Sequence, residues 1–540
     1  MAGAAGMLSV ATLLSRVMGL LREQVFAALL GAGFYGDAFT MAFRLPNLLR
    51  DLFAEGALSA AFQPAFIEQK KHHSLEAAYR LANLVMTVLL LVVGALVLLG
   101  ILYSPQLVDS WAAGYSQTPG KAELTVLLTR IMMPFLLLVS LAAVAMGMLN
   151  AQQRFLAPAL APALFNLATI VVGALLWSLK VGRTRGAAIA WAVATLIGGA
   201  LQLGAQLVPL WRSGYRFRLL FDLRLRDPGL RSVLKTMAPA TLGLVATQVN
   251  IFVSSSFASR EDGAVTWLAV AFRLMQLPIG MFGVAVGTVA LARAASSAAE
   301  RDLAVAMDGV RDTLRRGLVL VAFWTLPTAA VLWVLAEPIL RVIYQHGAFQ
   351  ASDTAAAAVA LRYYALGLLA YSAVKVVAPV FYALKLTRVP MLATLLAVGV
   401  SVLWCVALHP IYGYRALALS TSITATVNLA VLLVSFSRRY GGLWQSHVLL
   451  SLARITVAAT CAGLVMWTVL SSLLGTQTAA LSVPLGRTLG CLSLALVSGG
   501  TSYAVLCALM GVREVQEVGQ VAGRRLRRLL SRSTTRSISR

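Results

Sequence analysis

The 540-residue sequence has few charged residues, which make up 12% of it, and very few acidic ones, with only 20 Asp and Glu. Soluble domains carry about a quarter charged residues, so this chain has too few to cover a water-exposed surface. Hydrophobic residues account for 59% of the chain, and the mean hydropathy is +0.82. The composition excludes an ordinary soluble protein and predicts an integral membrane protein with many spans.

Cysteine and histidine are also scarce, with four and five residues. All four cysteines lie in apolar segments, at positions 405, 461, 491 and 507. They lack the paired spacing of a zinc site or a disulfide framework, and the histidines at 346, 409 and 447 show no ligand spacing either. We therefore expect no metal site, no cofactor and no catalytic residues.

Apolar segments long enough to cross a bilayer recur along the whole chain. A helix needs about 20 apolar residues to span the hydrocarbon core. Eleven charge-free runs meet this length, at 81–108, 131–153, 155–179, 186–211, 236–259, 274–292, 317–336, 389–414, 416–437, 455–486 and 488–512. Three further segments, at about 5–30, 36–66 and 354–384, have the length but contain charged residues. The sequence predicts an all-α polytopic membrane protein with 14 transmembrane helices.

The distribution of Lys and Arg predicts the orientation, because short cytoplasmic loops carry an excess of both. With the N-terminus inside, the densest basic segments fall on one side of the membrane: 70–71, 212–235, 311–316, 438–439 and the tail after 513. We therefore place both termini in the cytoplasm. The net charge of +25 is interpreted as topology and attraction to anionic lipids, not as nucleic-acid binding.

An internal repeat underlies the span pattern. At a shift of 232 positions, three residues that are unusual inside or beside spans recur: Pro46 as Pro278, Arg130 as Arg362, and Pro158 as Pro390. Six predicted spans separate the copies, and an even number means that the copies run parallel. In transporters built this way the substrate site lies between the repeats, which expose it to each side in turn.

The repeat predicts the domain organisation. We expect an N-lobe at 1–211 and a C-lobe at 236–440, each of six helices, joined by a basic loop at 212–235. Two further helices follow at 441–512, and a basic cytoplasmic tail at 513–540 ends the chain.

Charged residues inside predicted spans are the strongest functional signal, because each costs about 2.5–3.5 kcal/mol at the centre of a span. Such residues face a watery cavity or a partner. The candidate substrate-binding residues are Arg16, Arg22, Arg44, Arg50, Arg273 and Asp37. Arg16 and Glu23 share one face of an ideal helix, whereas Arg22 lies about 120° away from Arg16. We expect one of these arginines to be paired and the other to face a cavity.

The second predicted span contains a proline between two of these arginines. Pro46 lacks a backbone donor and disfavours the helical conformation of the residue before it, so we expect a kink or break between Arg44 and Arg50. A structural alternative is that both arginines pair with Asp37, Asp51 or Glu55. The arginines outnumber nearby acids, however, and a guanidinium surplus fits the oxygens of a phosphate or diphosphate.

These residues resemble the signature of a known family. The matching positions in the first part of the chain are Gly31, Gly33, Asp37, Phe43, Arg44, Pro46, Asn47, Arg50, Glu55 and Gly56. The resemblance continues through 273–278, 282–284, 347–349 and 381–383. Over nearly its whole length the sequence is similar to the MurJ/MviN lipid II flippases.

The resemblance implies the fold of the multidrug/oligosaccharidyl-lipid/polysaccharide (MOP) exporters. It implies that lipid II, the undecaprenyl-diphosphate-linked peptidoglycan precursor, is flipped from the inner to the outer leaflet of the bacterial cytoplasmic membrane. Within that pattern Arg16, Arg22, Arg50 and Arg273 correspond to cavity arginines, and the last two helices to a groove for the lipid tail. Some members bind sodium through the seventh and eleventh helices, but the stretches 250–256 and 383–387 contain no carboxylate, so the sequence does not favour a sodium site.

Several alternatives stay open at this point. An enzyme acting on the same lipid would need a carboxylate pair or metal cluster, and Glu261 with Asp262 is the one adjacent acidic pair on the expected outer side. An exporter of drugs or of another polyprenyl-linked oligosaccharide would share the fold. The driving force is either an ion gradient or the membrane potential, which does about 2.3 kcal/mol of work per unit charge per 100 mV. We expect a monomer whose partners are lipid II and membrane lipids.

Overall fold

The computed structural model describes residues 2–53, 57–222, 226–300, 302–474 and 484–515. Within these ranges every regular element is a helix, which confirms the all-α class. Ten helices have the length and hydropathy of a membrane span, and the bent pair α14 (Ala351–Leu366) and α15 (Leu368–Ala383) would make an eleventh. The polytopic membrane fold is confirmed, whereas the count of 14 spans stays a prediction.

The chain divides into two compact units. The first comprises residues 1–269 together with 343–354 and 405–417, and the second comprises 270–342, 355–404 and 418–540. Two short segments from the second half of the sequence thus pack with the first half. The predicted lobe boundaries stay a prediction.

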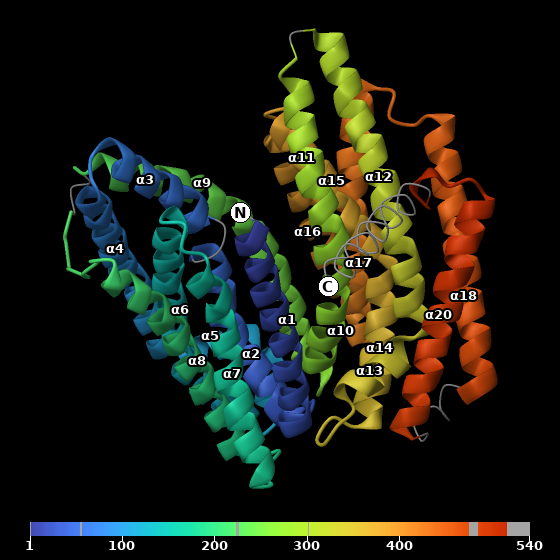
Figure 1. Cartoon of the computed structure of the whole chain (residues 1–540). Helices are drawn as coiled ribbons and strands as arrows, with labels where there is room; N and C mark the ends of the chain where they lie inside the picture. The colour runs from blue at the N-terminus through green and yellow to red at the C-terminus, as the bar shows by residue number, and fades with distance from the viewer. Residues whose placement is uncertain (1, 54–56, 223–225, 301, 475–483, 516–540) are drawn as a thin grey trace, which may run out of the picture. The chain divides into compact units, whose positions relative to one another are not determined.

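The first unit is a bundle whose helices run up and down with short connections (Figure 1). Its elements are α1 (Ala2–Leu30), α2 (Phe34–Phe53), α3 (Ala57–His72), α4 (Leu75–Leu102), α5 (Ser104–Trp111), the 3₁₀ turn η1 (Ala113–Gln117), α6 (Lys121–Ala151), α7 (Leu156–Ser178), α8 (Arg185–Arg212) and α9 (Pro228–Ala258). Ser74, Thr184 and Asp227 cap α4, α8 and α9, because each side chain accepts a bond from an otherwise unsatisfied amide of the first turn.

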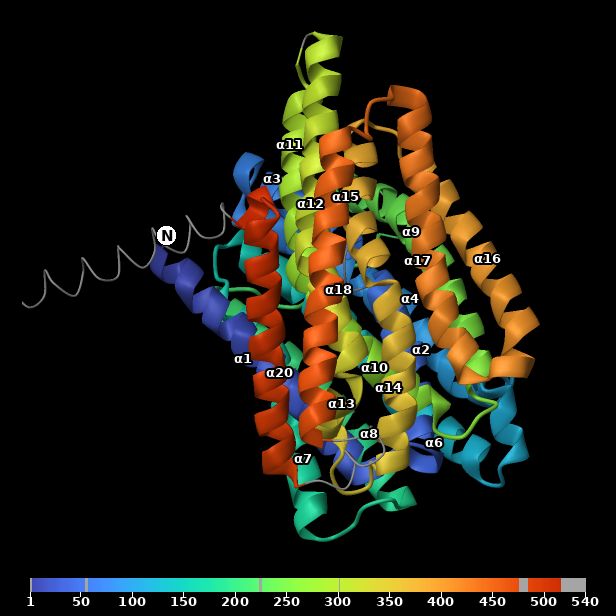
Figure 2. The same cartoon turned by 90° about the vertical axis from the view of Figure 1, so that its right-hand side faces the viewer.

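The second unit contains the later helices. Residues 264–269, at the start of α10 (Ala264–Pro278), belong to the first unit. The other elements are the π-helical turn η2 (Ile279–Val284), α11 (Ala285–Ala298), α12 (Leu303–Val334), α13 (Ala336–Tyr344), α16 (Arg388–Tyr412), α17 (Tyr414–Tyr440), α18 (Ser446–Leu474) and α20 (Leu485–Leu509). Residues 343–344 of α13, 351–354 of α14, 405–412 of α16 and 414–417 of α17 belong to the first unit. Figure 2 shows α18 and α20 side by side. Gly499 allows this approach, because a Cβ there would lie 2.3 Å from Met466 Cγ.

Helix boundaries repeat along the chain at the shift found in the sequence. Helices α4 and α12 end at Leu102 and Val334, α5 and α13 begin at Ser104 and Ala336, and α7 and α16 begin at Leu156 and Arg388. Each pair of positions differs by 232 residues. The agreement supports the internal duplication.

Of the kink or break expected between Arg44 and Arg50, the break is wrong and the kink stays a prediction. Helix α2 runs without interruption from Phe34 to Phe53, with Pro46 inside it. A proline inside a helix costs about 3 kcal/mol through its missing donor and steric clash. Packing offsets this cost, because Phe43, Leu45 and Leu49 on either side of the proline pack against a hydrophobic core of the unit. Glu55 and Gly56, which belonged to the predicted span, lie outside the described residues.

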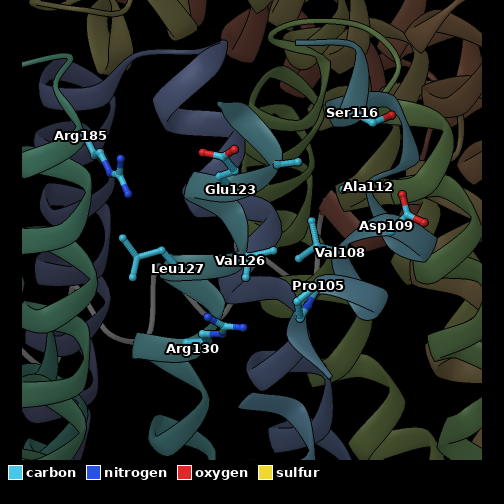
Figure 3. A pocket seen from close by; sticks show the side chains of 11 residues that line it. Pro105, Val108, Asp109, Ala112, Ser116, Glu123, Val126, Leu127, Arg130 and Arg185 are labelled. Atoms are coloured by element: carbon cyan, nitrogen blue, oxygen red, sulfur yellow. The ribbon is translucent and has the colours of Figure 1, made fainter. Parts of the chain in front are cut away.

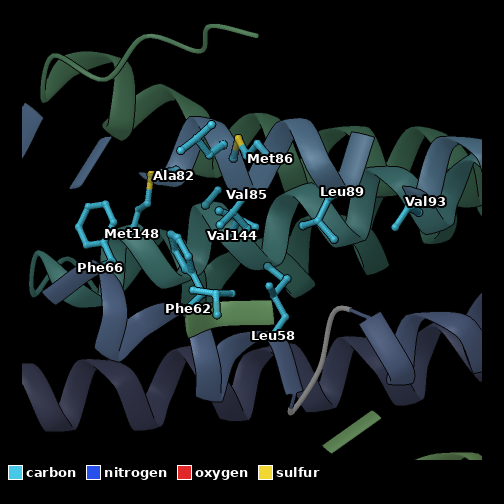
Figure 4. Packing of buried hydrophobic residues seen from close by; sticks show 14 of the residues in the cluster. Leu58, Phe62, Phe66, Ala82, Val85, Met86, Leu89, Val93, Val144 and Met148 are labelled. Carbon is cyan, nitrogen blue, oxygen red and sulfur yellow. The ribbon is translucent and has the colours of Figure 1, made fainter. Parts of the chain in front are cut away.

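That core lies between α3, α4 and α6 (Figure 4). Leu58, Phe62 and Phe66 of α3 recur at helical spacing and present one buried face to α4 and α6. Gly147 lets α6 approach closely, since a Cβ there would lie 2.8 Å from Phe62 Cδ1. This packing holds the helices that carry the charged residues described next.

Candidate functional site

Asp37 lies fully buried in the first turn of α2, just after a tight turn. Gly31 and Gly33 adopt φ values of +67° and +92°, which side-chain-bearing residues rarely adopt, and they bring the chain from α1 directly into α2. The Asp37 carboxylate accepts hydrogen bonds from Gly263 N at 2.7 Å, Thr266 N at 3.0 Å and Thr266 Oγ1 at 2.7 Å. The carboxylate therefore joins α2 to the beginning of α10.

Lys121, the first residue of α6, completes this network. Its side chain is 2% exposed, and Nζ donates to Asp37 Oδ2 at 3.2 Å and to Asp262 Oδ1 at 2.6 Å. The ammonium also lies 4.4 Å from the centre of the Tyr115 ring, within cation–π range. We call Asp37, Lys121, Asp262, Gly263 and Thr266 the buried ionic network. The sequence placed Asp37 among the candidate ligands but gave no sign that Lys121 would be its partner.

Other hydrogen bonds in the first unit also join residues from the two halves of the sequence. Ala348 N donates to Ala28 O at 2.7 Å, and Gly114 N donates to Ser259 Oγ at 3.1 Å. A Cβ on Gly31 would lie 2.6 Å from Ala348 O, so the glycine permits this approach. Connections from residues before 121 and after 258 thus form one closed, hydrogen-bonded end.

The arginines of α1 have different surroundings. Arg16 is exposed, whereas Arg22 is half-buried, forms an ion pair with Glu23 and lies 5.2 Å from the centre of the Phe165 ring. The Nε of Arg22 donates to Glu23 Oε1 at 3.1 Å. Of the two, Arg22 is therefore the paired arginine, with its sequence neighbour as partner.

The arginines of α2 are half-buried. Arg44 donates to Ser255 Oγ of α9, so it does not use Asp37, which is saturated by the buried ionic network. Arg50 is near enough to Arg22 for their guanidinium charges to repel. The structure thus brings Arg22 and Arg50 together in the first unit. The side chains of Asp51 and Glu55 lie outside the described residues.

Arg273 belongs to the second unit. It is exposed on α10, next to Phe272, whose ring packs at 5.5 Å from Tyr364 and 6.4 Å from Tyr371. Its role in binding substrate together with the arginines of α1 and α2 stays a prediction.

Within the described ranges, no group of three or more His, Cys, Asp or Glu side chains is arranged to hold a metal ion. The expectation about sodium stays a prediction.

Comparison with known proteins gives consistent matches. The model of the family described as "Lipid II flippase MurJ" matches residues 26–486. A probable lipid II flippase MurJ of Rhizobium tropici is 35% identical over 458 residues, covering 84% of each chain. Lipid II flippase MurJ of Burkholderia cenocepacia is 34% identical over 466 residues, covering 84% of this chain and 88% of its own.

Two solved structures resemble the fold. A lipid II flippase MurJ in an inward closed conformation has a TM-score of 0.74 and 25% identity, covering 93% of this chain and 98% of its own. An inward-facing multidrug resistance MATE family transporter of the MOP superfamily has a TM-score of 0.67 and 15% identity, covering 82% of this chain and 98% of its own. At that identity the second match supports the fold alone.

Proposed function

The chain belongs to the lipid II flippase MurJ family of multi-pass inner-membrane transporters, and we propose that it moves lipid II from the inner to the outer leaflet by alternating access. The family consists of flippases and not of enzymes. The family match over residues 26–486 is the observation that carries the proposal.

The closed end of the first unit supports alternating access. Residues from both halves of the duplicated sequence meet there through the buried ionic network and through the bond from Ala348 N to Ala28 O. If the halves rock, these bonds form in one state and break in the other. With both termini in the cytoplasm, α1 ends and α2 begins at the outer face, so the network would hold the outer end of the first unit closed.

The arginines of α1 and α2 bind the diphosphate. The charges of Arg22 and Arg50 repel each other, and an anion placed between them relieves that repulsion. Two guanidinium groups can each offer paired donors to phosphate oxygens. Arg16 and Arg44 of the first unit and Arg273 of the second complete the proposed set. Asp37 acts in closure and not in contact with substrate, because its carboxylate is already saturated.

Complementation of a flippase-depleted bacterium tests the arginine assignment. We expect Arg22→Ala, Arg50→Ala and Arg273→Ala to fail to support growth, although each protein reaches the membrane. Arg154→Ala is the matched control, because Arg154 is an exposed arginine that donates to Pro209 O. Growth with all three variants would remove the arginines from the mechanism. Failure of Arg50→Lys would favour forked phosphate recognition over charge alone.

A reversible cross-link tests closure independently. The bond between Ala348 N and Ala28 O brings the two residues together, so Ala28→Cys with Ala348→Cys is placed to form a disulfide. We expect oxidation to stop flipping and reductant to restore it. Flipping that continues with the cross-link formed would show that this end does not open.

A further inference from the structure

A second charged region of the first unit lies apart from the candidate site. A cavity of about 520 Å³ opens between α5, α6 and α8 (Figure 3). Four charged side chains line it: Asp109 of α5, Glu123 and Arg130 of α6, and Arg185 at the start of α8. Most of the other lining residues are apolar, among them Val108, Val126 and Leu127.

These four charges have no ion-pair partner among the residues that the structure describes. Two of them are positive and two are negative. The only hydrogen bond that the structure gives the Arg130 side chain runs from Nε to Ser104 Oγ at 2.8 Å, and Ser104 in turn donates to Ile101 O at 2.9 Å. The outer nitrogens of the Arg130 guanidinium face the cavity without a protein acceptor among the described residues.

Arg130 lies at the edge of an apolar segment, directly before the charge-free run 131–153. Arg130 follows Glu123 by seven residues on α6, which places it about 10 Å further along the helix axis. Helix α6 has the length and hydropathy of a membrane span. A charged side chain inside a span normally pairs with a group of opposite charge or faces water.

The internal repeat supplies a direct comparison. Arg362 is the copy of Arg130 at the shift of 232, and it forms an ion pair with Glu337 at 3.5 Å and donates to Trp333 O at 3.2 Å. Trp333 and Glu337 correspond to Ile101 and Pro105. The first copy therefore keeps the link to the end of the preceding helix, through Ser104, but has a proline in place of the carboxylate. A carboxylate therefore neutralises the arginine of the second copy, whereas a cavity faces the arginine of the first.

We propose that this cavity binds the zwitterionic headgroup of a membrane phospholipid of the phosphatidylethanolamine type. Arg130 and Arg185 take the phosphate, while Glu123 and Asp109 take the ammonium group. The apolar lining contacts the first part of the acyl chains, and exposed Leu98, Leu102 and Tyr103 on the neighbouring end of α4 continue that apolar surface. Paired charges of both signs distinguish this site from one for a purely anionic lipid.

Native mass spectrometry of the full chain in detergent tests the proposal. The protein is titrated with phosphatidylethanolamine or phosphatidylglycerol, and inorganic phosphate is added as a competitor. We expect saturable retention of one phosphatidylethanolamine, in preference to phosphatidylglycerol, that phosphate does not displace. Equal retention of the two lipids would overturn the zwitterion assignment, and displacement by phosphate would show that a free anion is the ligand.

Variants locate the site. Arg130→Gln is expected to weaken phosphatidylethanolamine binding about 10- to 100-fold, the effect of losing a charge-assisted contact. Arg130→Lys keeps the positive charge and is expected to retain binding. This result would show that weak binding by Arg130→Gln comes from the lost charge and not from misfolding. Glu123→Gln is expected to abolish the preference for phosphatidylethanolamine, and Arg154→Gln, just beyond the far end of α6, to change nothing. Unchanged binding by Arg130→Gln would overturn the site.

Discussion

Replacing Lys121 with methionine should expose how much the buried ionic network contributes to stability. Lys121 and Asp37 have side-chain exposures of 2% and 0%, so neither charge is solvated by water. Removing one partner of a buried pair typically costs about 3–5 kcal/mol, because the other charge is left uncompensated. Asp37 would keep its three bonds from Gly263 and Thr266, so we expect about 3 kcal/mol, near the lower end of that range.

The reverse replacement should cost about as much. In Asp37→Asn the ammonium of Lys121 keeps its bond to Asp262, whose side chain is 69% exposed and whose carboxylate is solvated. An asparagine amide has one acceptor oxygen where the carboxylate has two, so at least one buried donor that now binds Asp37 loses its acceptor. We expect a loss of about 3 kcal/mol, from that donor and from the lost charge. The double variant should be less destabilised than the sum of the single variants, with a coupling energy of about 1 kcal/mol or more.

The free energy of unfolding, measured by circular dichroism during titration from mild detergent into dodecyl sulfate, provides the readout. Lys71→Met, at an exposed lysine of α3, is the control and should change the free energy by less than about 0.5 kcal/mol. Strictly additive single effects, or a Lys121→Met protein as stable as the parent, would refute the reasoning, since either result means that Lys121 and Asp37 are not coupled.

Four further outcomes are expected. Gly31→Ala should destabilise the closed end by about 1–3 kcal/mol, since φ is +67° and the new Cβ would meet Ala348 O at 2.6 Å; wild-type stability in the same titration would contradict the close approach. Asp227→Ala should cost about 1 kcal/mol by removing the cap on Leu230 N, whereas Asp227→Asn should keep most of it. Hydrogen bonds from Asp227 N and Arg226 N lower the pKa of Asp222; the stabilisation is therefore present above the carboxyl's unfolded-state pKa of about 3.9 and is lost as pH falls through the lowered value. Limited proteolysis at the start of α9 should thus become faster only in strong acid. In Asp222→Asn it should be faster than in the parent protein at every pH. Flipping in vesicles should increase with an inside-negative potential and ignore a sodium gradient; the opposite result would favour ion coupling.

Much of the fold follows from local composition. Apolar runs predicted most of the spanning helices, because insertion into a bilayer depends on segment length and hydropathy, which neighbouring residues alone determine. The repeat at a shift of 232 can be recognised from Pro46, Arg130 and their copies without knowledge of the helix boundaries. The family resemblance likewise depends on short sequence motifs, such as those around Asp37 and Arg50.

The candidate site was less accessible from sequence. Local preference predicts a kink or break at Pro46, but α2 continues through the proline, and Phe43 and Leu49 on either side of it pack against the core. Arg44 donates to Ser255, 211 positions away, and not to Asp37, one of the carboxylates that the structural alternative offers. Neither outcome can be predicted from the few residues next to Pro46 or Arg44 in the sequence.

Composition, the repeat and the family motifs are enough to predict a helical membrane protein of duplicated design and the family to which it belongs. The tertiary structure decided the partners: Lys121 with Asp37 across 84 positions, and Thr266 with Asp37 across 229. It also decided that Arg130 has no carboxylate beside it in the described chain, although its copy Arg362 has one. The reason is that hydropathy acts on each segment separately, whereas a buried charge is stabilised by whichever groups the packed helices bring within hydrogen-bond distance.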